Sequence, residues 1–284
     1  MPNSVLSPVR VTSPAKLNLM LHITGRRADG YHELQTLFQL LDYGDTMVFT
    51  PIDNTSDVQL TDNSGLVQED NLVWRAAELL RPKRRSPVGL RIHLEKVLPM
   101  GGGLGGGSSN AATTLLIVNH LWQCGLSIDA LAELGRELGA DVPVFVRGTS
   151  AWAEGVGEQL TAVDLPEAWF VVAHPDIHVS TADIFNSRSL TRNSQKTTIR
   201  TALAGEGRND CEATVREQYP AIANMLDTMH KLGPARLTGT GACGFISFNT
   251  EAEAQNAAQQ LARDYAVFVA QGINRSPVAS VIDA

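Results

Sequence analysis

Apolar residues at alternate positions in two stretches of the chain predict β-strands. Over residues 90–95 they alternate with arginine, histidine and glutamate, a pattern typical of a strand with one buried face. The same period over residues 17–23 predicts a second strand and places Lys16 and Asn18 together on its opposite face. From this spacing alone, Lys16 is expected at a solvated strand end.

Longer apolar runs predict helices in the first half of the chain. Residues 111–121 are rich in alanine and leucine, which favours a buried helix that begins near Ser108. The pair Asp70 and Asn71, and Ser127 later in the chain, are residue types that cap helices, and each precedes a run with helical spacing. We therefore expect two further helices, one after each cap.

The second half of the chain alternates short strands with helices, which predicts a smaller α+β sandwich. We expect strands at 169–173, 236–238, 245–248 and 267–270, and helices at 181–185, 210–217, 222–232 and 251–263. In the first half, residues 42–45 predict a turn before a short strand at 47–49. The length of 284 residues allows a two-domain α+β fold, divided into residues 1–160 and 161–284.

Composition and charge narrow the class of protein. The chain is 43% hydrophobic and 19% charged, as expected of a soluble globular protein, and its formal net charge of −7 argues against nucleic acid or an anionic membrane as the main partner. The start of the chain lacks the basic and apolar segments of a signal peptide, so we expect a cytoplasmic protein. The three cysteines are odd in number and widely spaced, which favours buried thiols over disulfides or a metal site.

A glycine-rich segment lies between the predicted strand at 90–95 and the predicted helix at 111–121. Glycines allow successive backbone amides to point at one anion, and a helix N-terminus adds a positive dipole at the same place. A flexible surface loop explains the glycines but not this order of strand, glycines, serines and helix. The candidate phosphate-binding residues are Pro99, Met100, Gly101, Gly102, Gly103, Leu104, Gly105, Gly106, Gly107, Ser108 and Ser109. The two serines are also candidates to cap the helix or contact a metal bound to the phosphates.

Two better-known phosphate loops fit this segment less well. A P-loop requires a lysine after its last glycine, and Ser108 stands there instead. The dinucleotide fingerprint is met formally by the glycines, as in any run so rich in glycine. Its acidic partner should end the next strand, whereas the candidate, Asp129, opens a predicted helix. The sequence therefore argues against a nicotinamide enzyme.

The segment from Pro99 to Asn110 resembles the phosphate-binding motif of the GHMP kinases, which are named for galactokinase, homoserine kinase, mevalonate kinase and phosphomevalonate kinase. Residues 14–19, 139–145 and 238–244 resemble further family motifs. The resemblance implies ATP and Mg²⁺ as cofactors and a two-domain GHMP kinase fold with the active site in the cleft between the domains. It also implies that Asp141 is the catalytic base. We expect Lys16 to be its charge partner and Asn18 to orient the attacking hydroxyl.

Residues 26–38 are similar to the cytidine-facing segment of the GHMP kinases that act on 4-diphosphocytidyl-2-C-methyl-D-erythritol. The resemblance implies that Tyr31 stacks on the cytosine, that His32 hydrogen-bonds the edge of the base and that Phe185 lies across the ring. It further implies transfer of the ATP γ-phosphoryl group to the 2-hydroxyl of that substrate, a step of non-mevalonate isoprenoid precursor synthesis. The metal ligands are left unassigned.

The sequence is compatible with two other classes of function. A GHMP kinase for homoserine or a mevalonate derivative would keep the glycine loop but would have no use for the Tyr31 and His32 pair. A non-catalytic nucleotide-binding module would bind ATP without transferring phosphate, and the presence of both Lys16 and Asp141 argues against it. The expected partners are therefore small molecules.

Overall fold

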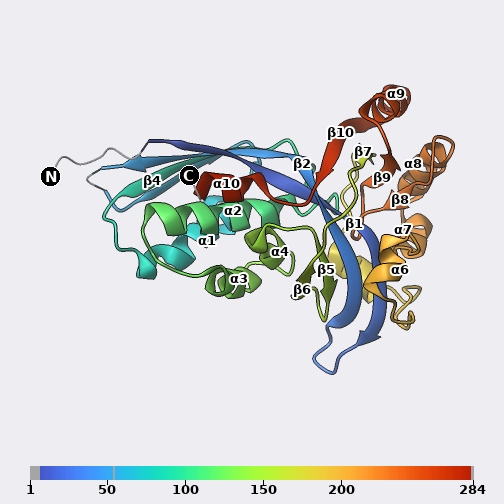
Figure 1. The fold of residues 1–284 in the computed structure, drawn as a ribbon, viewed down its shortest axis with the longest axis horizontal. Helices are drawn as coiled ribbons and strands as arrows, with labels where there is room; N and C mark the ends of the chain where they lie inside the picture. The colour runs from blue at the N-terminus through green and yellow to red at the C-terminus, as the bar shows by residue number, and fades with distance from the viewer. Residues whose placement is uncertain (1–6, 54, 283–284) are drawn as a thin grey trace.

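Two long antiparallel strands connect the two halves of the molecule. The computed structural model describes residues 7–53 and 55–282. In it β1 (Val9–Arg26) pairs with β2 (His32–Ile52) over nearly their whole length, and Figure 1 shows this ribbon running from one half into the other. Each half therefore contains part of the same ribbon.

The larger half is a sheet covered on one face by helices. In this sheet β4 (Gly89–Glu95) joins β2 to β3 (Val58–Asp62), and the hairpin of β5 (Ala151–Glu154) and β6 (Gln159–Ala162) pairs with β2 through β5. The covering helices in Figure 1 are α1 (Leu72–Leu80), α2 (Gly106–Leu121), α3 (Ile128–Arg136), α4 (Val142–Arg147) and α10 (Pro277–Ile282). Two short 3₁₀ helices, Gln68–Asp70 and Arg81–Lys83, flank α1.

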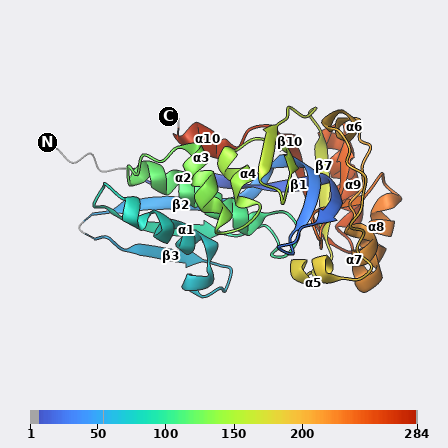
Figure 2. The same cartoon turned by 90° about the horizontal axis from the view of Figure 1, so that it is seen from below.

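The smaller half is built on four strands in the order β10, β7, β9 and β8. Their bounds are β7 (Trp169–His174), β8 (Arg236–Leu237), β9 (Gly244–Phe248) and β10 (Ala266–Ile273). The helices of this half are α5 (Thr181–Asn186), α6 (Ile199–Leu203), α7 (Glu212–Gln218), α8 (Pro220–His230) and α9 (Glu251–Leu261). Figure 2 shows α7, α8 and α9 on the outer side of these strands. The end of β10 also pairs with β2, which joins the two sheets.

Elements with a strong periodic signal form where the sequence predicts them. The strand at 90–95 is β4, with its apolar side chains buried and its charged ones exposed. Asn71 and Ser127 cap α1 and α3 by accepting hydrogen bonds from Val73 N and Ala130 N. The strands and longer helices of the second half also form near their expected positions.

The predicted turn at residues 42–45 is wrong, because β2 continues through it. A Cβ atom on Gly44 would lie 1.9 Å from the carbonyl oxygen of Ser13, so this glycine permits close approach of β1 rather than a reversal of the chain. Asp45 then enters the interior of the sheet, where it is fully buried.

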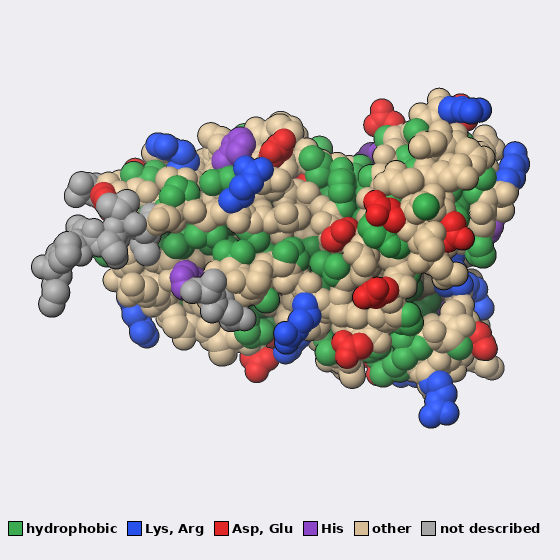
Figure 3. Space-filling model, turned by 45° about the horizontal axis from the view of Figure 1, so that its top comes forward, with side chains coloured by type: hydrophobic (Ala, Val, Ile, Leu, Met, Phe, Trp, Pro, Cys, Tyr) green, Lys and Arg blue, Asp and Glu red, His purple; other side chains and the backbone are tan. Residues whose placement is uncertain are grey.

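Short elements without a periodic pattern are absent from the prediction, namely the β5 and β6 hairpin, α6 and α10. The division at residue 160 stays a prediction; β6 crosses that residue, and α10 packs against β1 and α2, so the end of the chain rejoins the larger half. Within the described ranges, no helix is long and apolar enough to cross a membrane. Figure 3 shows acidic and basic side chains interspersed over one face.

Candidate active site

A cavity of about 710 Å³ lies where the two halves meet. Its wall is formed by β1, β2, the glycine loop, the residues before α4, α5 and the loop at 239–240. The cavity brings together nearly all the predicted site residues, namely Lys16, Asn18, Tyr31, His32, Asp141, Phe185 and the segment from Pro99 to Ser108.

Ser109 is the exception. Helix α2 begins at Gly106 rather than near Ser108, and its N-cap is Gly105, so neither serine caps the helix. The hydroxyl of Ser109 is fully buried and accepts a hydrogen bond of 2.8 Å from Ser13 Oγ on β1. Ser108, one residue earlier on the helix, lines the cavity.

The glycine loop is held against the second glycine turn of the chain. Ala242 N and Cys243 N donate to the carbonyl oxygens of Gly101 and Gly102, each over 3.1 Å. Gly103 has a φ of 76°, and a Cβ atom there would lie 2.2 Å from the carbonyl oxygen of Thr238. The conformation of the loop therefore requires glycine at this position.

We expect Gly103→Ala to raise the KM for ATP about tenfold, because a left-handed alanine costs about 1–2 kcal/mol and its methyl group would push the two loops apart. Steady-state kinetics at varied ATP would measure the change. Gly205→Ala is the matched control, since Gly205 has a similar φ of 78° but nothing within 4 Å of its Cβ position. Equal KM values for the two variants would contradict this role of the close contact.

Lys16 is buried, so its interpretation as a solvated strand end is wrong. Its Nζ lies 3.3 Å from Asp141 Oδ2, and it donates to Asn18 Oδ1 over 2.7 Å and to Gly103 O over 2.9 Å. One ammonium group thus connects β1, the glycine loop and the residue before α4. The side chain of Lys16 is only 3% exposed, whereas that of Asp141 is 35% exposed and faces the cavity.

Asn18 contacts this pair through Lys16, and its role in orienting the attacking hydroxyl stays a prediction. Its Nδ2 donates to Thr36 Oγ1 over 2.8 Å, and Thr36 Oγ1 in turn donates to Met20 O over 2.6 Å. These bonds fix the amide so that Oδ1 faces the ammonium group of Lys16.

Asp141 is held at the start of a helix. It occupies the N-cap position of α4, and Pro143 lies in the first turn, where its missing N–H costs no hydrogen bond. Val142 N donates to Gly139 O over 3.1 Å, which closes the connection to the preceding residues. The carboxylate is therefore mounted on a rigid segment.

Lys96 is a cavity residue that sequence reasoning missed. Its Nζ donates to Asp45 Oδ2 over 2.7 Å and to Asn110 Oδ1 over 3.1 Å. The other carboxylate oxygen of Asp45 accepts from Val97 N and Leu98 N, over 2.8 and 2.9 Å. Asp45 thus fixes the segment that leads into the glycine loop. The only sequence feature that could have indicated Lys96 is its position three residues before Pro99.

The far end of the cavity carries the aromatic residues. The rings of His32 and Phe185 stack with centroids 5.1 Å apart, and Tyr31 is 66% exposed at the tip of the β1–β2 hairpin. Arg192, which sequence reasoning also missed, donates from Nε to His32 Nε2 over 3.0 Å. Burial lowers the pKa of His32 below its usual value, and the charges of Arg192 and Arg26 lower it further.

The cysteines are buried, as expected from their spacing. Burial raises the pKa of the Cys211 thiol to about 12, with a smaller contribution from the charge of Asp210. Cys243 lies directly behind the glycine loop, where its sulfur would contact a Cβ atom placed on Gly102. In the part of the chain that the structure describes, no group of three or more histidine, cysteine, aspartate or glutamate side chains is arranged to hold a metal ion.

Comparison with known proteins places these features in a family. Residues 71–149 match the GHMP kinases N terminal domain, and residues 188–267 match the family described as GHMP kinases C terminal. The chain is 52% identical over 279 residues, 94% of each chain, to a 4-diphosphocytidyl-2-C-methyl-D-erythritol kinase of Hahella chejuensis (strain KCTC 2396).

Solved structures agree with this assignment. The crystal structure of a 4-(cytidine 5'-diphospho)-2C-methyl-D-erythritol kinase has a TM-score of 0.82 and 33% identity, over 93% of this chain and 99% of that one. A homoserine kinase from Cytophaga hutchinsonii has a TM-score of 0.64 and 17% identity, over 98% of each chain, and shares the fold. Because these matches extend over most of its length, the chain belongs to the GHMP kinase family.

Proposed function

We propose that this kinase transfers the γ-phosphoryl group of ATP to the 2-hydroxyl of 4-diphosphocytidyl-2-C-methyl-D-erythritol. The observation that carries the proposal is the 3.3 Å pair of Lys16 and Asp141 beside the glycine loop, in a cavity whose far end holds His32 and Phe185. The 52% identity to the Hahella enzyme of that name supports the choice of substrate.

The glycine loop and α2 would bind the phosphates of ATP. Phosphoryl transfer has a loose transition state, so catalysis depends mainly on positioning and on stabilising charge over the phosphate oxygens. The positive end of the α2 dipole and the ammonium of Lys96 both lie at this wall of the cavity and supply that stabilisation.

Mg²⁺ fits the oxygen donors at the same wall. Kinases bind this ion with one or two protein oxygens together with the phosphates of the nucleotide, so a cluster of several carboxylates is not required. The hydroxyl of Ser108, which lines the cavity, is the protein donor we propose, together with the phosphates of the nucleotide. When bound, the ion would neutralise charge on the phosphate oxygens.

Asp141 is the proposed general base, which accepts the proton of the substrate hydroxyl as the oxygen attacks phosphorus. Lys16 holds the carboxylate in place and adds positive charge next to the group being transferred. Asn18 keeps the ammonium of Lys16 aimed at this position. Each of the three residues thus contributes to the alignment of base and hydroxyl.

We expect Tyr31→Ala to raise the KM for the cytidine substrate about tenfold, with a smaller fall in kcat, because stacking on an aromatic ring contributes about 1–3 kcal/mol per base. The exposed position of Tyr31 means that its loss leaves the core intact. Tyr31→Phe, which keeps the ring, is the control. Steady-state kinetics at varied concentrations of the cytidine substrate measure this KM. An unchanged KM for the alanine variant would show that Tyr31 is not part of the site.

A GHMP kinase for homoserine or a mevalonate derivative is the second candidate, because homoserine and mevalonate kinases share the fold. The proposal is tested by incubating the protein with ATP and each of the three acceptors and measuring product masses. We expect one added phosphoryl group on the cytidine substrate alone. Phosphorylation of homoserine or mevalonate without the cytidine product would overturn the proposed function.

A further inference from the structure

We propose that a second cavity, on the face of the β1–β2 ribbon opposite the active site, binds a small phosphorylated polyol. This cavity has a volume of about 460 Å³ and is lined by His22 on β1, by most of residues 191–197 and by Arg208. Among the described residues, none lines both this cavity and the active-site cavity. The inference goes beyond the proposed function, and its test measures binding without any phosphoryl transfer.

Two successive residues of β1 face the two cavities. Leu21 lines the active-site cavity, and His22, the next residue along the strand, lines the second cavity. Side chains that follow one another on a strand point to opposite faces of the sheet. A ligand in the second cavity would therefore lie on the reverse face of the ribbon and would not compete with ATP or its acceptor.

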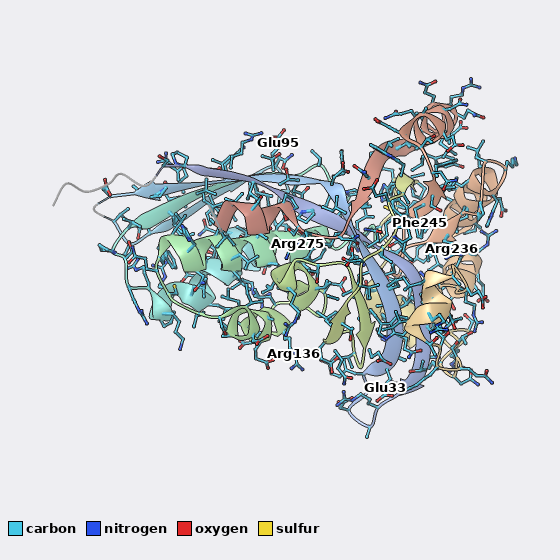
Figure 4. All side chains as sticks on the ribbon, in the orientation of Figure 1. Glu33, Glu95, Arg136, Arg236, Phe245 and Arg275 are labelled. Atoms are coloured by element: carbon cyan, nitrogen blue, oxygen red, sulfur yellow. The ribbon has the colours of Figure 1, made fainter. Side chains whose placement is uncertain are left out.

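The wall of the second cavity is anchored through Ser194. Its backbone N donates to Ile23 O on β1 over 3.0 Å, and its Oγ donates to the buried carboxylate of Asp210 over 2.6 Å. Figure 4 shows α6, which follows this segment, beside the half of the ribbon that ends near the labelled Glu33. Because these bonds fix the wall, a ligand would bind to a largely preformed site.

The lining of the second cavity is positively charged. Lys196 and Arg208 are its charged residues, and within the described ranges no carboxylate lines it. Arg208 Nε donates to Asp210 Oδ1 over 2.8 Å, so this fully buried carboxylate offsets part of the arginine's charge from behind the wall. The structure gives Lys196 no carboxylate partner in residues 7–53 and 55–282, which leaves its charge available to an anion.

The chemistry of the lining favours a phosphate ester of a polyol. Ammonium and guanidinium groups bind phosphate through charge-assisted hydrogen bonds, and they repel metal ions. The other lining residues carry hydroxyl or amide groups, namely Thr191, Asn193, Ser194, Gln195 and Thr197. These groups can exchange hydrogen bonds with the hydroxyls of a sugar alcohol. An apolar ligand would meet no apolar wall among the described residues.

His22 is an independent indication of a ligand at this place. It is only 9% exposed, and both of its ring nitrogens are buried without a hydrogen-bond partner in the described part of the chain. Burial lowers the pKa of its ring, while the charges of Asp210 and Arg208 act in opposite directions. Buried polar atoms are nearly always bonded in folded proteins, because an unpaired one lowers stability. An unpaired imidazole at a polar cavity is therefore best explained by a ligand that the cavity accepts.

Isothermal titration with sorbitol phosphate at low ionic strength tests the proposal. We expect saturable binding with a Kd of about 1 mM or lower, and no binding of sorbitol itself. Lys196→Met removes one charge-assisted hydrogen bond and should raise the Kd about tenfold. Lys231→Met is the matched control, because Lys231 is also exposed in the smaller half but does not line the cavity. Its Kd should equal that of wild type.

A second pair of variants adds a negative charge in place of removing a positive one. Asn193→Asp puts a carboxylate in the lining and should raise the Kd about tenfold or more by repelling the phosphate. Asn256→Asp puts the same charge on the exposed surface of α9, away from the cavity, and should bind sorbitol phosphate like wild type. Both asparagines are exposed, so neither change disturbs the core.

The NMR spectrum of the protein labelled with ¹⁵N-histidine locates the ligand, with His22→Gln used to assign the signals. We expect the ring signals of His22 to shift as sorbitol phosphate is added. An absence of saturable binding, equal Kd values for Lys196→Met and Lys231→Met, or binding that leaves the His22 signals unchanged would each overturn the inference. None of these outcomes bears on the proposed kinase activity, which is tested separately by product mass.

Discussion

Replacing Asp141 with asparagine is expected to lower kcat about 100- to 10,000-fold, the usual contribution of a general base, with little change in the KM for ATP. Asparagine keeps the shape of the side chain but cannot take the proton of the hydroxyl. The glycine loop should be undisturbed, because Lys16 keeps its bonds to Asn18 and Gly103. Single-turnover kinetics with saturating ATP would isolate the chemical step.

Asp129→Asn is the control for this experiment. Its carboxylate also pairs with a cation, Arg147, over 2.9 Å, but its side chain is 81% exposed and outside the cavity. We expect a kcat close to that of wild type. A kcat for Asp141→Asn as high as that of this control would mean that the substrate hydroxyl loses its proton without help from Asp141.

Replacing Asp45 with asparagine is expected to lower the free energy of unfolding by about 3–5 kcal/mol, as for other buried ion pairs that lose one partner. The fully buried carboxylate accepts from Lys96, Asn110 and two backbone amides. An amide group would turn one of its two oxygens into a donor that faces donors, and Lys96 would keep an uncompensated charge. Urea denaturation followed by circular dichroism measures the loss.

Glu133→Gln provides the comparison for Asp45. Glu133 pairs with Arg136 over 3.1 Å on the surface of α3, and its side chain is 72% exposed. Exposed pairs contribute about 0–1 kcal/mol, so its loss should hardly move the denaturation midpoint. Similar losses for the two variants would show that Asp45 is not an anchor of the glycine loop.

How well an element could be predicted depends on how local its causes are. Strand β4 and helices α1 and α3 follow from alternation, apolar spacing and caps within the same few residues. The error at residues 42–45 has a distant cause, because their composition favours a turn and only the close approach of Ser13 makes Gly44 part of a strand. At residues 42–45 a tertiary contact therefore overrides the local preference for a turn.

The residues of the candidate site also differ in how well the sequence predicts them. Spacing alone placed Lys16 in solvent, and only the family motifs predicted its approach to Asp141, which lies in a distant part of the chain. Lys96 and Arg192 carry no local pattern, because their importance comes from what the fold places around them. Ser109 was expected in the cavity, but the start of α2 at Gly106 turns it toward β1 instead.

The return of α10 to the larger half bears on the order in which the chain can fold during synthesis. Val278 is buried in the same core as residues of α2 and β2, and Val281 and Ile282 pack against that core. These residues follow the whole smaller half in the sequence, so the ribosome makes them after it. The core of the larger half therefore stays incomplete until the smaller half has been synthesised, and part of its apolar surface stays uncovered during that time.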